Sequence, residues 1–559
     1  MLNYYHRNSI FDVDRAFSAS GFSTNSSPAN LELSRAAVIG AGVPAAGLPE
    51  GDTFFGHSPF SGNGLAPALA YTYTTKKSSF FNFEPGRSAV PDSERYGGFV
   101  NADHKVFGDQ LVLYGDLSYE NVETVHSLAP SPTGFFDSPG RTILAIPPHA
   151  PGPTLGGPSY DETGVSLGAF NPFNPFQQII SGGSRARLAE FGNRAIDNET
   201  DAFFSTIGFK GDKLFDGSWG YDAGFRYSEI KNTGMGNTVS TSRFNRILNA
   251  ADPIFDPTSS QFIGTTVPYN PFGDARVPIA SNAPTIAFAT INPTEVDISK
   301  LATLDLNIYT TELFKLPAGG VGLAFGGQFR REALRQNPDE LSTSGDLLDQ
   351  TAFATTNAGR KTYALYAETD LPVFGASFAA PGFHALEFTA AVRYEEFRSN
   401  GSNVVVPKFG LRWQPFDESL TVRATWGEGF HEPSLIELFG NPIQGLTDSS
   451  RGLFEAETPF VIRSNPNLQP EDSRAFSGGI VYTPKFIPGL TLTIDLFDIE
   501  STGRVNSTPN PDDIVQRDLE GRSLPGETVF RGADGSVTSI EATYQNGGSQ
   551  KARGADFAI

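Results

Sequence analysis

Apolar and polar side chains alternate along residues 386–426, and similar stretches recur through this chain. In residues 386–394, Leu386, Phe388 and Val392 fall at alternate positions, with Glu387 and Arg393 between them. Successive side chains of a β-strand point to opposite faces, so such a strand has one apolar face and one charged face. Alternation alone fits a half-buried strand in any protein. Its repetition, with an ordered layout of turns and loops, constrains the fold much further.

Short and long connections alternate between the expected strands. The short ones, rich in the Gly, Pro and Asp that tight turns require, fall at residues 105–110, 211–217, 316–320, 415–419 and 484–489. The long ones fall at about 11–93, 122–200, 231–299, 429–471 and 503–552. Loops of this length are uncommon in compact domains. Short periplasmic turns opposite long extracellular loops are typical of bacterial outer-membrane barrels.

We therefore expect an all-β fold, a transmembrane antiparallel β-barrel with about 14 strands, and one partial barrel domain over residues 1–559. No run of 18 apolar residues occurs, so no membrane-spanning helix is expected. Membrane-spanning β-strands contain no such apolar run, because only every second residue of a barrel strand faces lipid. Trp219, Tyr227, Trp413 and Trp426 lie near strand ends, where aromatic girdles meet the membrane interface.

Composition and motifs point away from nucleic acid, metal and catalysis. A net charge of −21 disfavours nucleic acid, which needs basic surfaces. There is no cysteine, and the seven histidines form no His-x-x-x-His pair, so we expect no metal site and no cofactor. Residues 164–168 match the Gly-x-Ser-x-Gly pattern of hydrolases, but without the strand before it and the helix after it that the motif needs. We expect no catalytic residues and no enzymatic activity.

Two motifs carry a family resemblance. Residues 423–438 read Arg-Ala-Thr-Trp-Gly-Glu-Gly-Phe-His-Glu-Pro-Ser-Leu-Ile-Glu-Leu, and residues 465–471 read Asn-Pro-Asn-Leu-Gln-Pro-Glu. In this order they resemble the TonB-dependent outer-membrane receptor family. The matching positions are Gly429, Phe430, Pro433, Ser434, Leu435, Glu437 and Leu438, whereas His431 stands where that family more often has Arg. The glycines permit a sharp exit from a strand, and the prolines fix the return of the loop.

The resemblance implies ligand-gated, TonB-energised uptake of a scarce, bulky nutrient across the outer membrane of a Gram-negative-type bacterium. The implied partners are outer-membrane lipid, a plug domain, the TonB complex and an extracellular ligand whose class the loops decide. Such barrels have roughly 22 strands. We therefore expect the chain to be part of a larger barrel, without a plug domain and inactive on its own. Residues 1–7 lack the pattern of a signal peptide and look like a strand already under way. The alternative is a complete cytosolic protein with frayed ends.

Two sets of residues are candidates for functional contacts. The loop aromatics in or beside Asn-Pro-Phe stretches are candidate ligand contacts: Phe173, Phe176, Tyr269 and Phe272. The alternative is that they pack the loops together over the barrel mouth. Charged residues in mid-strand are expected to face the lumen: Glu368, Asp370, Glu387, Arg393, Glu395 and Arg423. They would contact the plug or line the substrate path, or else stiffen the wall as an ion-pair network.

Two other functions fit the pattern. The first is a passive, porin-like outer-membrane channel. The second is a secreted, soluble β-sandwich that binds or hydrolyses its ligand. A sandwich requires a second sheet over the apolar face that carries Leu386, Phe388, Val392 and Tyr394.

Overall fold

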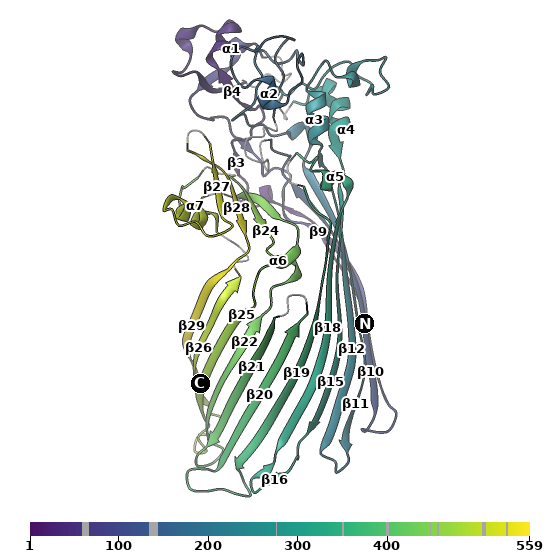
Figure 1. Cartoon of the computed structure of the whole chain (residues 1–559), viewed down its shortest axis with the longest axis vertical. Coiled ribbons are helices and arrows are strands. Elements are labelled where there is room, and N and C mark those ends of the chain that lie inside the picture. Colours follow the sequence, from purple (N-terminus) through teal and green to yellow (C-terminus); the bar gives the residue numbers. More distant parts are fainter. Residues whose placement is uncertain are drawn as a thin grey trace.

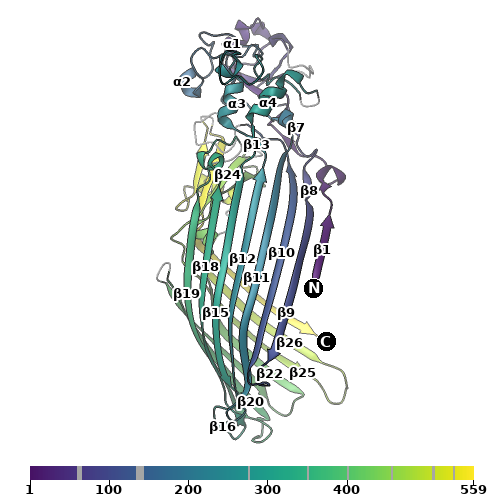
Figure 2. The same ribbon diagram turned by 90° about the vertical axis from the view of Figure 1, so that its right-hand side faces the viewer.

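The computed structural model is built on one 14-stranded antiparallel sheet that curls into a deep trough (Figure 1). It describes residues 1–559 except 59–65, 134–143, 275–276, 349–351, 399–401, 448, 455–457, 506–509 and 533–534. In sheet order the strands are β1 (Leu2–Arg7), β9 (Asp92–Lys105), β10 (Val112–Leu128), β11 (Arg194–Leu214), β12 (Trp219–Gly236), β15 (Thr294–Thr310), β18 (Gly322–Pro338), β19 (Thr356–Phe374), β20 (Ala385–Phe397), β21 (Asn403–Gln414), β22 (Leu420–His431), β25 (Glu471–Tyr482), β26 (Leu492–Val505) and β29 (Asn546–Ala558). Neighbours in the sheet follow one another along the chain, which makes an up-and-down meander with β1 and β29 at its edges (Figures 1 and 2).

The asymmetry of the connections is confirmed. Short turns at 106–111, 215–218, 311–321, 375–384, 415–419 and 483–491 lie at the lower end in Figure 1. Most loops at the upper end are long. The turn at 311–321 contains the small hairpin of β16 (Lys315–Leu316) and β17 (Gly319–Gly320). The predicted all-β antiparallel architecture and its strand number are therefore correct.

Several strands run further than their sequence pattern indicated. β10 extends to Leu128 and β11 begins at Arg194, so the loop expected at 122–200 is confined to 129–193. The loops expected at 231–299 and 503–552 shorten to 237–293 and 506–545. In the added length, Glu123 pairs with Glu199 across β10 and β11. Polar residues occupy both faces there, so the apolar alternation fades while the backbone ladder continues.

The outer face of the sheet is apolar and uncovered. Phe388 and Val392 are each 43% exposed, and Tyr394 is 37% exposed. Across the neighbouring strand, Phe388 pairs with Leu411 and Tyr394 with Val405, so the apolar row continues round the trough. Among the described residues no second sheet covers this face, which rules out the β-sandwich. An uncovered apolar band of this kind suits contact with lipid.

Ion pairs tie neighbouring turns together at the short end. The carboxylate of Asp109 accepts hydrogen bonds from Lys105 at 2.7 Å and from Lys213, in the next hairpin, at 2.8 Å. These two ammonium groups lower the pKa of Asp109 to about 2. Asp417 contacts Lys485 at 2.7 Å in the same way, and the pKa of this carboxyl is also lowered. The turns are thus linked to each other as well as to their own strands.

The long loops fold into two structures above the trough. The first, which we call the cap, consists of the described residues within 8–91, 129–193, 237–293 and 339–355, and these share one hydrophobic core (Figures 1 and 2). Besides short 3-10 turns, its strands and α-helices are β2 (Ile10–Phe11), β3 (Phe22–Ser23), β4 (Asn30–Ser34), α1 (Arg35–Gly40), β5 (Thr53–His57), β6 (Thr72–Thr74), β7 (Phe81–Asn82), β8 (Ser88–Val90), α2 (Tyr160–Thr163), β13 (Thr238–Val239), α3 (Thr241–Ile247), α4 (Ala283–Ala289), β14 (Thr290–Ile291) and α5 (Glu340–Ser344).

The second structure, which we call the side module, consists of the described residues within 432–470 and 506–545. It contains α6 (Leu435–Phe439), β23 (Ile443–Thr447), β24 (Thr458–Arg463), α7 (Pro511–Leu519), β27 (Thr528–Arg531) and β28 (Val537–Thr543). Its four strands form a small sheet of their own, and α7 packs against β27 and β28. None of the helices that the structure describes is long and apolar enough to cross a membrane.

Candidate functional site

The inner wall of the trough carries the charged residues selected from the sequence. Opposite positions of antiparallel strands share a face, and Glu368 pairs with Ala391 while Asp370 pairs with Thr389. The inner face defined by this register includes Glu387, Arg393 and Glu395 on β20, and Arg423 on β22 through its pairing with Arg412. All six predicted residues therefore lie on the face opposite the apolar band.

Several of these charges are engaged within the wall. The guanidinium of Arg393 donates to Glu395 at 2.6 Å and to the side-chain oxygen of Gln328 at 3.0 Å. Gln328 in turn donates to Asp305 at 2.6 Å, which extends the network over β15, β18 and β20. Arg330 adds a weaker contact to Glu395 at 3.8 Å. These contacts join neighbouring strands, as a stiffening network would.

Two groups of inner-wall charges differ in their pairing. Arg423 makes a two-pronged contact with Asp495, the shorter distance being 2.7 Å, and Glu387 contacts Arg412 at 3.5 Å. Glu368 and Asp370 are exposed to the lumen and form no salt bridge with a described residue, although Asp370 shares a hydrogen bond with the carboxyl group of Glu387. The wall thus presents two exposed acidic side chains that have no cationic partner among the described residues.

The motif after β22 folds inward and docks on the wall through Arg360. This residue of β19 is only 6% exposed. It donates to Glu332 at 2.6 Å and to the carbonyl oxygen of Pro433 at 2.7 Å, and lies 3.4 Å from Glu432. Two strands, β20 and β21, separate β19 from β22 in the sheet. Arg360 therefore holds the segment that follows β22 against a distant part of the wall, at the mouth of the trough (Figure 1).

Local chemistry explains the shape of the docked segment. Ser434 caps α6, and the Glu437 side chain returns a contact to the Ser434 backbone, which satisfies the free amides of the first turn. Beyond the helix, the amide of Asn441 donates to Gln336 on β18 at 2.9 Å. The amide of Asn465 donates to the carbonyl of Glu437 at 2.8 Å. The two motifs recognised in the sequence thus contact each other, and both serve to build the mouth.

The Asn-Pro-Phe stretches have a structural role in the cap. In each, the asparagine oxygen accepts from the amide of the phenylalanine two residues later at 3.0 Å, at Asn171, Asn174 and Asn270. Proline between them has no N–H, so this turn competes with no other backbone bond. The amide nitrogen of Asn174 also donates to the carbonyls of Pro147 at 2.8 Å and Gln178 at 3.0 Å.

The predicted loop aromatics lie inside the cap. Phe176 is fully buried, Tyr269 and Phe272 are 4% and 3% exposed, and Phe173 packs against the same core. Their positions fit the second of the two roles considered for them, the packing of loops against each other. The sequence signal for this packing role is the repeated Asn-Pro-Phe pattern, because each asparagine can form a local turn that places the following phenylalanine at a fixed position in the cap.

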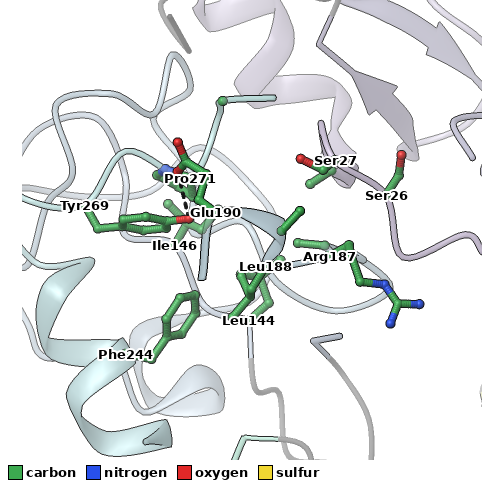
Figure 3. Close-up of a pocket in the computed structure, with 14 residues that line it drawn as sticks. Ser26, Ser27, Leu144, Ile146, Arg187, Leu188, Glu190, Phe244, Tyr269 and Pro271 are labelled. Atoms are coloured by element: carbon green, nitrogen blue, oxygen red, sulfur yellow. Dashed lines mark hydrogen bonds between the residues drawn. The ribbon is translucent and has the colours of Figure 1, made fainter. Parts of the chain in front are cut away.

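Glu190 joins the cap loops at a small cavity (Figure 3). Its carboxylate accepts from the hydroxyl of Tyr269 at 3.3 Å, from Asn282 at 2.7 Å and from the amide of Ile279 at 2.7 Å. Burial, and secondly the charge of Glu190, raise the pKa of Tyr269 well above its usual value. The cavity beside them has a volume of about 20 Å³, room for one water and no more. It cannot admit a bulky ligand.

Comparison with known proteins identifies the barrel. A family model described as TonB dependent receptor-like, beta-barrel matches residues 149–559, more than half of the chain. No curated protein matches the chain. Among solved structures, a variant of the ferric enterobactin receptor PfeA from Pseudomonas aeruginosa has 13% identity and a TM-score of 0.40, over 92% of this chain and 65% of that one.

Two further solved structures are similar at the same low level. The RagAB peptide transporter has 11% identity and a TM-score of 0.42, over 84% of this chain and 44% of that one. The siderophore receptor PirA from P. aeruginosa has 12% identity and a TM-score of 0.34, over 92% and 70%. The chain thus spans less than two thirds of the length of PfeA and of the RagAB chain. The matched family consists of outer-membrane barrels of Gram-negative bacteria, and this chain belongs to it: the protein is a TonB-dependent receptor-like β-barrel.

Proposed function

We propose that this protein forms the barrel of a receptor that takes up a scarce, bulky nutrient across the outer membrane, with energy supplied by the TonB complex through a plug domain. The observation that carries the proposal is the family match over residues 149–559. A polar inner wall, an apolar outer band and an ordered cap over the mouth all suit a gated pathway. In this role the protein performs no covalent chemistry on its cargo.

Within this function we assign separate roles to the two groups of inner-wall charges. Glu368 and Asp370, which face the lumen without a salt bridge to a described residue, would contact the plug or the passing nutrient. Arg393 with Glu395, and Arg423 with Asp495, would stiffen the wall. Charge reversal at Glu368 should therefore impair uptake while the barrel keeps its stability. Reversal at Arg423 should instead lower stability, and unchanged uptake and stability in both variants would refute the assignment.

Genetic complementation tests the uptake itself. A deletion strain carrying the gene would be grown with a ferric siderophore, cobalamin, an oligosaccharide or a peptide as the limiting nutrient. The expected result is growth that the gene restores on one of these classes, and only in cells with an intact TonB complex. Restoration without TonB, together with steady ion conductance of the purified protein in planar bilayers, would show a passive channel and overturn the proposal.

A further inference from the structure

Basic side chains gather on the outer face of the sheet, just above its apolar band. In one row across four strands, Tyr227 pairs with Ala302, Ala302 with Arg331, and Arg331 with Lys361. The amide of Arg398, the first residue beyond the end of β20, donates to the carbonyl of Lys361 at 2.9 Å, so this arginine continues the row beside β19. The chain as a whole has a net charge of −21. A local group of cations on the membrane side therefore runs against the overall charge and suggests an anionic partner.

The row lies at the height expected for lipid headgroups. Directly below it, Phe329 pairs with Tyr363, and one row further down Leu365 pairs with Tyr394. Tyrosines mark the boundary between the hydrocarbon region and the polar headgroups. Arg398 lies over the ring of Tyr363, 5.6 Å from its centre, so the cations stand immediately outside that boundary.

Arg331 and Lys361 are exposed and have no carboxylate partner in the described part of the chain. Their neighbour Arg398 contacts Glu396 at 3.1 Å. The opposite side of the barrel differs, because there the outward cations of β25 and β29 are neutralised. Lys551 contacts Glu500 at 3.1 Å, and Arg553 contacts Asp498 at 2.8 Å. Unpaired positive charge is therefore concentrated on β18 and β19.

Two hollows lie on the same strands, one beside the cations and one below them. The upper hollow has a volume of about 380 Å³. Its lining includes the cations Arg331, Lys361 and Arg398, and the small residues Ala333 and Gly359, which do not fill it. The lower one is an apolar groove of about 400 Å³. Its lining includes the small residues Ala367, Thr369 and Ala390 together with Leu323, Val392 and Phe409.

The spacing of the two hollows fits one lipid molecule. Six residues separate Lys361 from Ala367 along β19, which corresponds to about 20 Å of strand. Barrel strands are tilted by roughly 35–45°, so the difference in depth is about 15 Å. Half of the hydrocarbon core of a bilayer is also about 15 Å thick. An acyl chain that follows the tilted strand down from a headgroup at the cations therefore reaches the groove.

We propose that the outer face of β18–β20 holds one anionic, phosphorylated lipid of the outer leaflet. Its phosphate lies between Arg331, Lys361 and Arg398, and one of its acyl chains occupies the groove over Ala367 and Ala390. This site depends on the location of the barrel in the outer membrane and is independent of nutrient uptake, so its test leaves the proposed function untouched.

Lipid retention by the whole protein, purified from outer membranes in mild detergent, tests the site. Native mass spectrometry would measure binding of a bis-phosphorylated glycolipid (lipid A) and of zwitterionic phosphatidylcholine. The wild-type protein should prefer lipid A. The double variant Arg331→Ala/Lys361→Ala should bind it about 30-fold more weakly, the usual contribution of two basic residues at an anionic membrane surface. The matched control Lys551→Ala/Arg553→Ala removes two paired cations and should bind as the wild type does.

A second variant separates a lipid from a free anion. Ala367→Phe/Ala390→Phe fills the groove without changing any charge, and should retain less lipid A. Equal retention by this variant, or displacement of lipid A by inorganic phosphate, would show that the cations bind phosphate alone and would overturn the proposal. Wild-type retention by the Arg331/Lys361 variant, or an equal loss in the control, would overturn it as well. Heat-modifiable gel mobility would verify that each variant is folded.

Discussion

Replacing Arg360 by alanine should release the segment of residues 432–441 from the barrel wall. The side chains of Arg360 and Glu432 are each 5% exposed, and that of Glu332 is 25% exposed. Removal of one partner from a buried ion pair costs about 3–5 kcal/mol, because the remaining charge loses its counterion. Partial exposure of Glu332 favours the lower end of this range, about 3 kcal/mol.

The loss should be local. A cost of about 3 kcal/mol raises the population of the undocked segment by roughly 150-fold. The amides that join the segment to its surroundings report this directly: Asn441 donates to Gln336 at 2.9 Å, and Asn465 donates to Glu437 at 2.8 Å. Hydrogen exchange at both amides should accelerate by about that factor, while the amides of β10–β12 keep their rates.

Two further variants establish the cause. Arg423→Ala removes another arginine of the inner wall, but this side chain is 53% exposed and its partner Asp495 is 31% exposed. Exposed pairs contribute about 0–1 kcal/mol, so exchange at Asn441 should change little. In the double variant Arg360→Met/Glu432→Gln both charges are removed together, and the segment should be docked more firmly than in Arg360→Met alone.

The reasoning fails under either of two results. If Arg360→Ala leaves exchange at Asn441 and Asn465 within about threefold of the wild-type rate, a cost below about 0.7 kcal/mol follows, too small for a buried anchor. If exchange accelerates equally in β10–β12, the arginine stabilises the whole sheet and has no special relation to the mouth.

Three other perturbations have defined outcomes. Asn174→Ala leaves two buried carbonyls without their donor, at a cost of about 2–4 kcal/mol, so limited proteolysis should cut the cap faster at residues 144–193. Because the pKa of Tyr269 is raised in the folded cap, its contribution is complete below pH 10 and is lost as the pH rises further; phenolate absorbance should show one late-titrating group fewer in Tyr269→Phe. Val392→Lys puts a charge in the apolar outer band and should cost about 2–4 kcal/mol, whereas Ala391→Lys, directed to the lumen, should leave heat-modifiable folding intact.

The sequence predicted the strands best where one face meets lipid. In residues 386–394 the alternation is sharp because lipid accepts only apolar side chains on one face while the lumen accepts polar ones on the other. Above that level, as at Val122 to Leu128 in β10, water reaches both faces and the alternation disappears. The pairing of backbone amides and carbonyls continues there, and it leaves no trace in side-chain polarity.

The site was less predictable because its contacts link residues far apart in the chain. Arg360 and Pro433 are 73 positions apart, and nothing near Arg360 distinguishes it from other charged residues of alternating strands. The motif at residues 423–438 could be recognised in the sequence, but the sequence did not show that Arg360 is its contact on the barrel wall. The loop aromatics show the opposite case. Asn-Pro-Phe is a local signal, and the hydrogen bond that each asparagine makes two residues ahead could have been expected from its sequence alone.

Charged residues of β18 and β19 fix the register of the barrel. Arg330 faces the inner network and Arg331 the membrane surface; Arg360 anchors the mouth and Lys361 faces outward. A strand shifted by one residue exchanges its two faces. Such a shift in β19 would remove Arg360 from Glu332 and turn Lys361 into the lumen, and would also place Glu368 in the apolar band. Burying the charge of Glu368 and losing the Arg360 contact both cost free energy, so only one register of these strands is stable. In that register each adjacent pair of cations, Arg330 with Arg331 and Arg360 with Lys361, has one member on the lumen side and one on the membrane side.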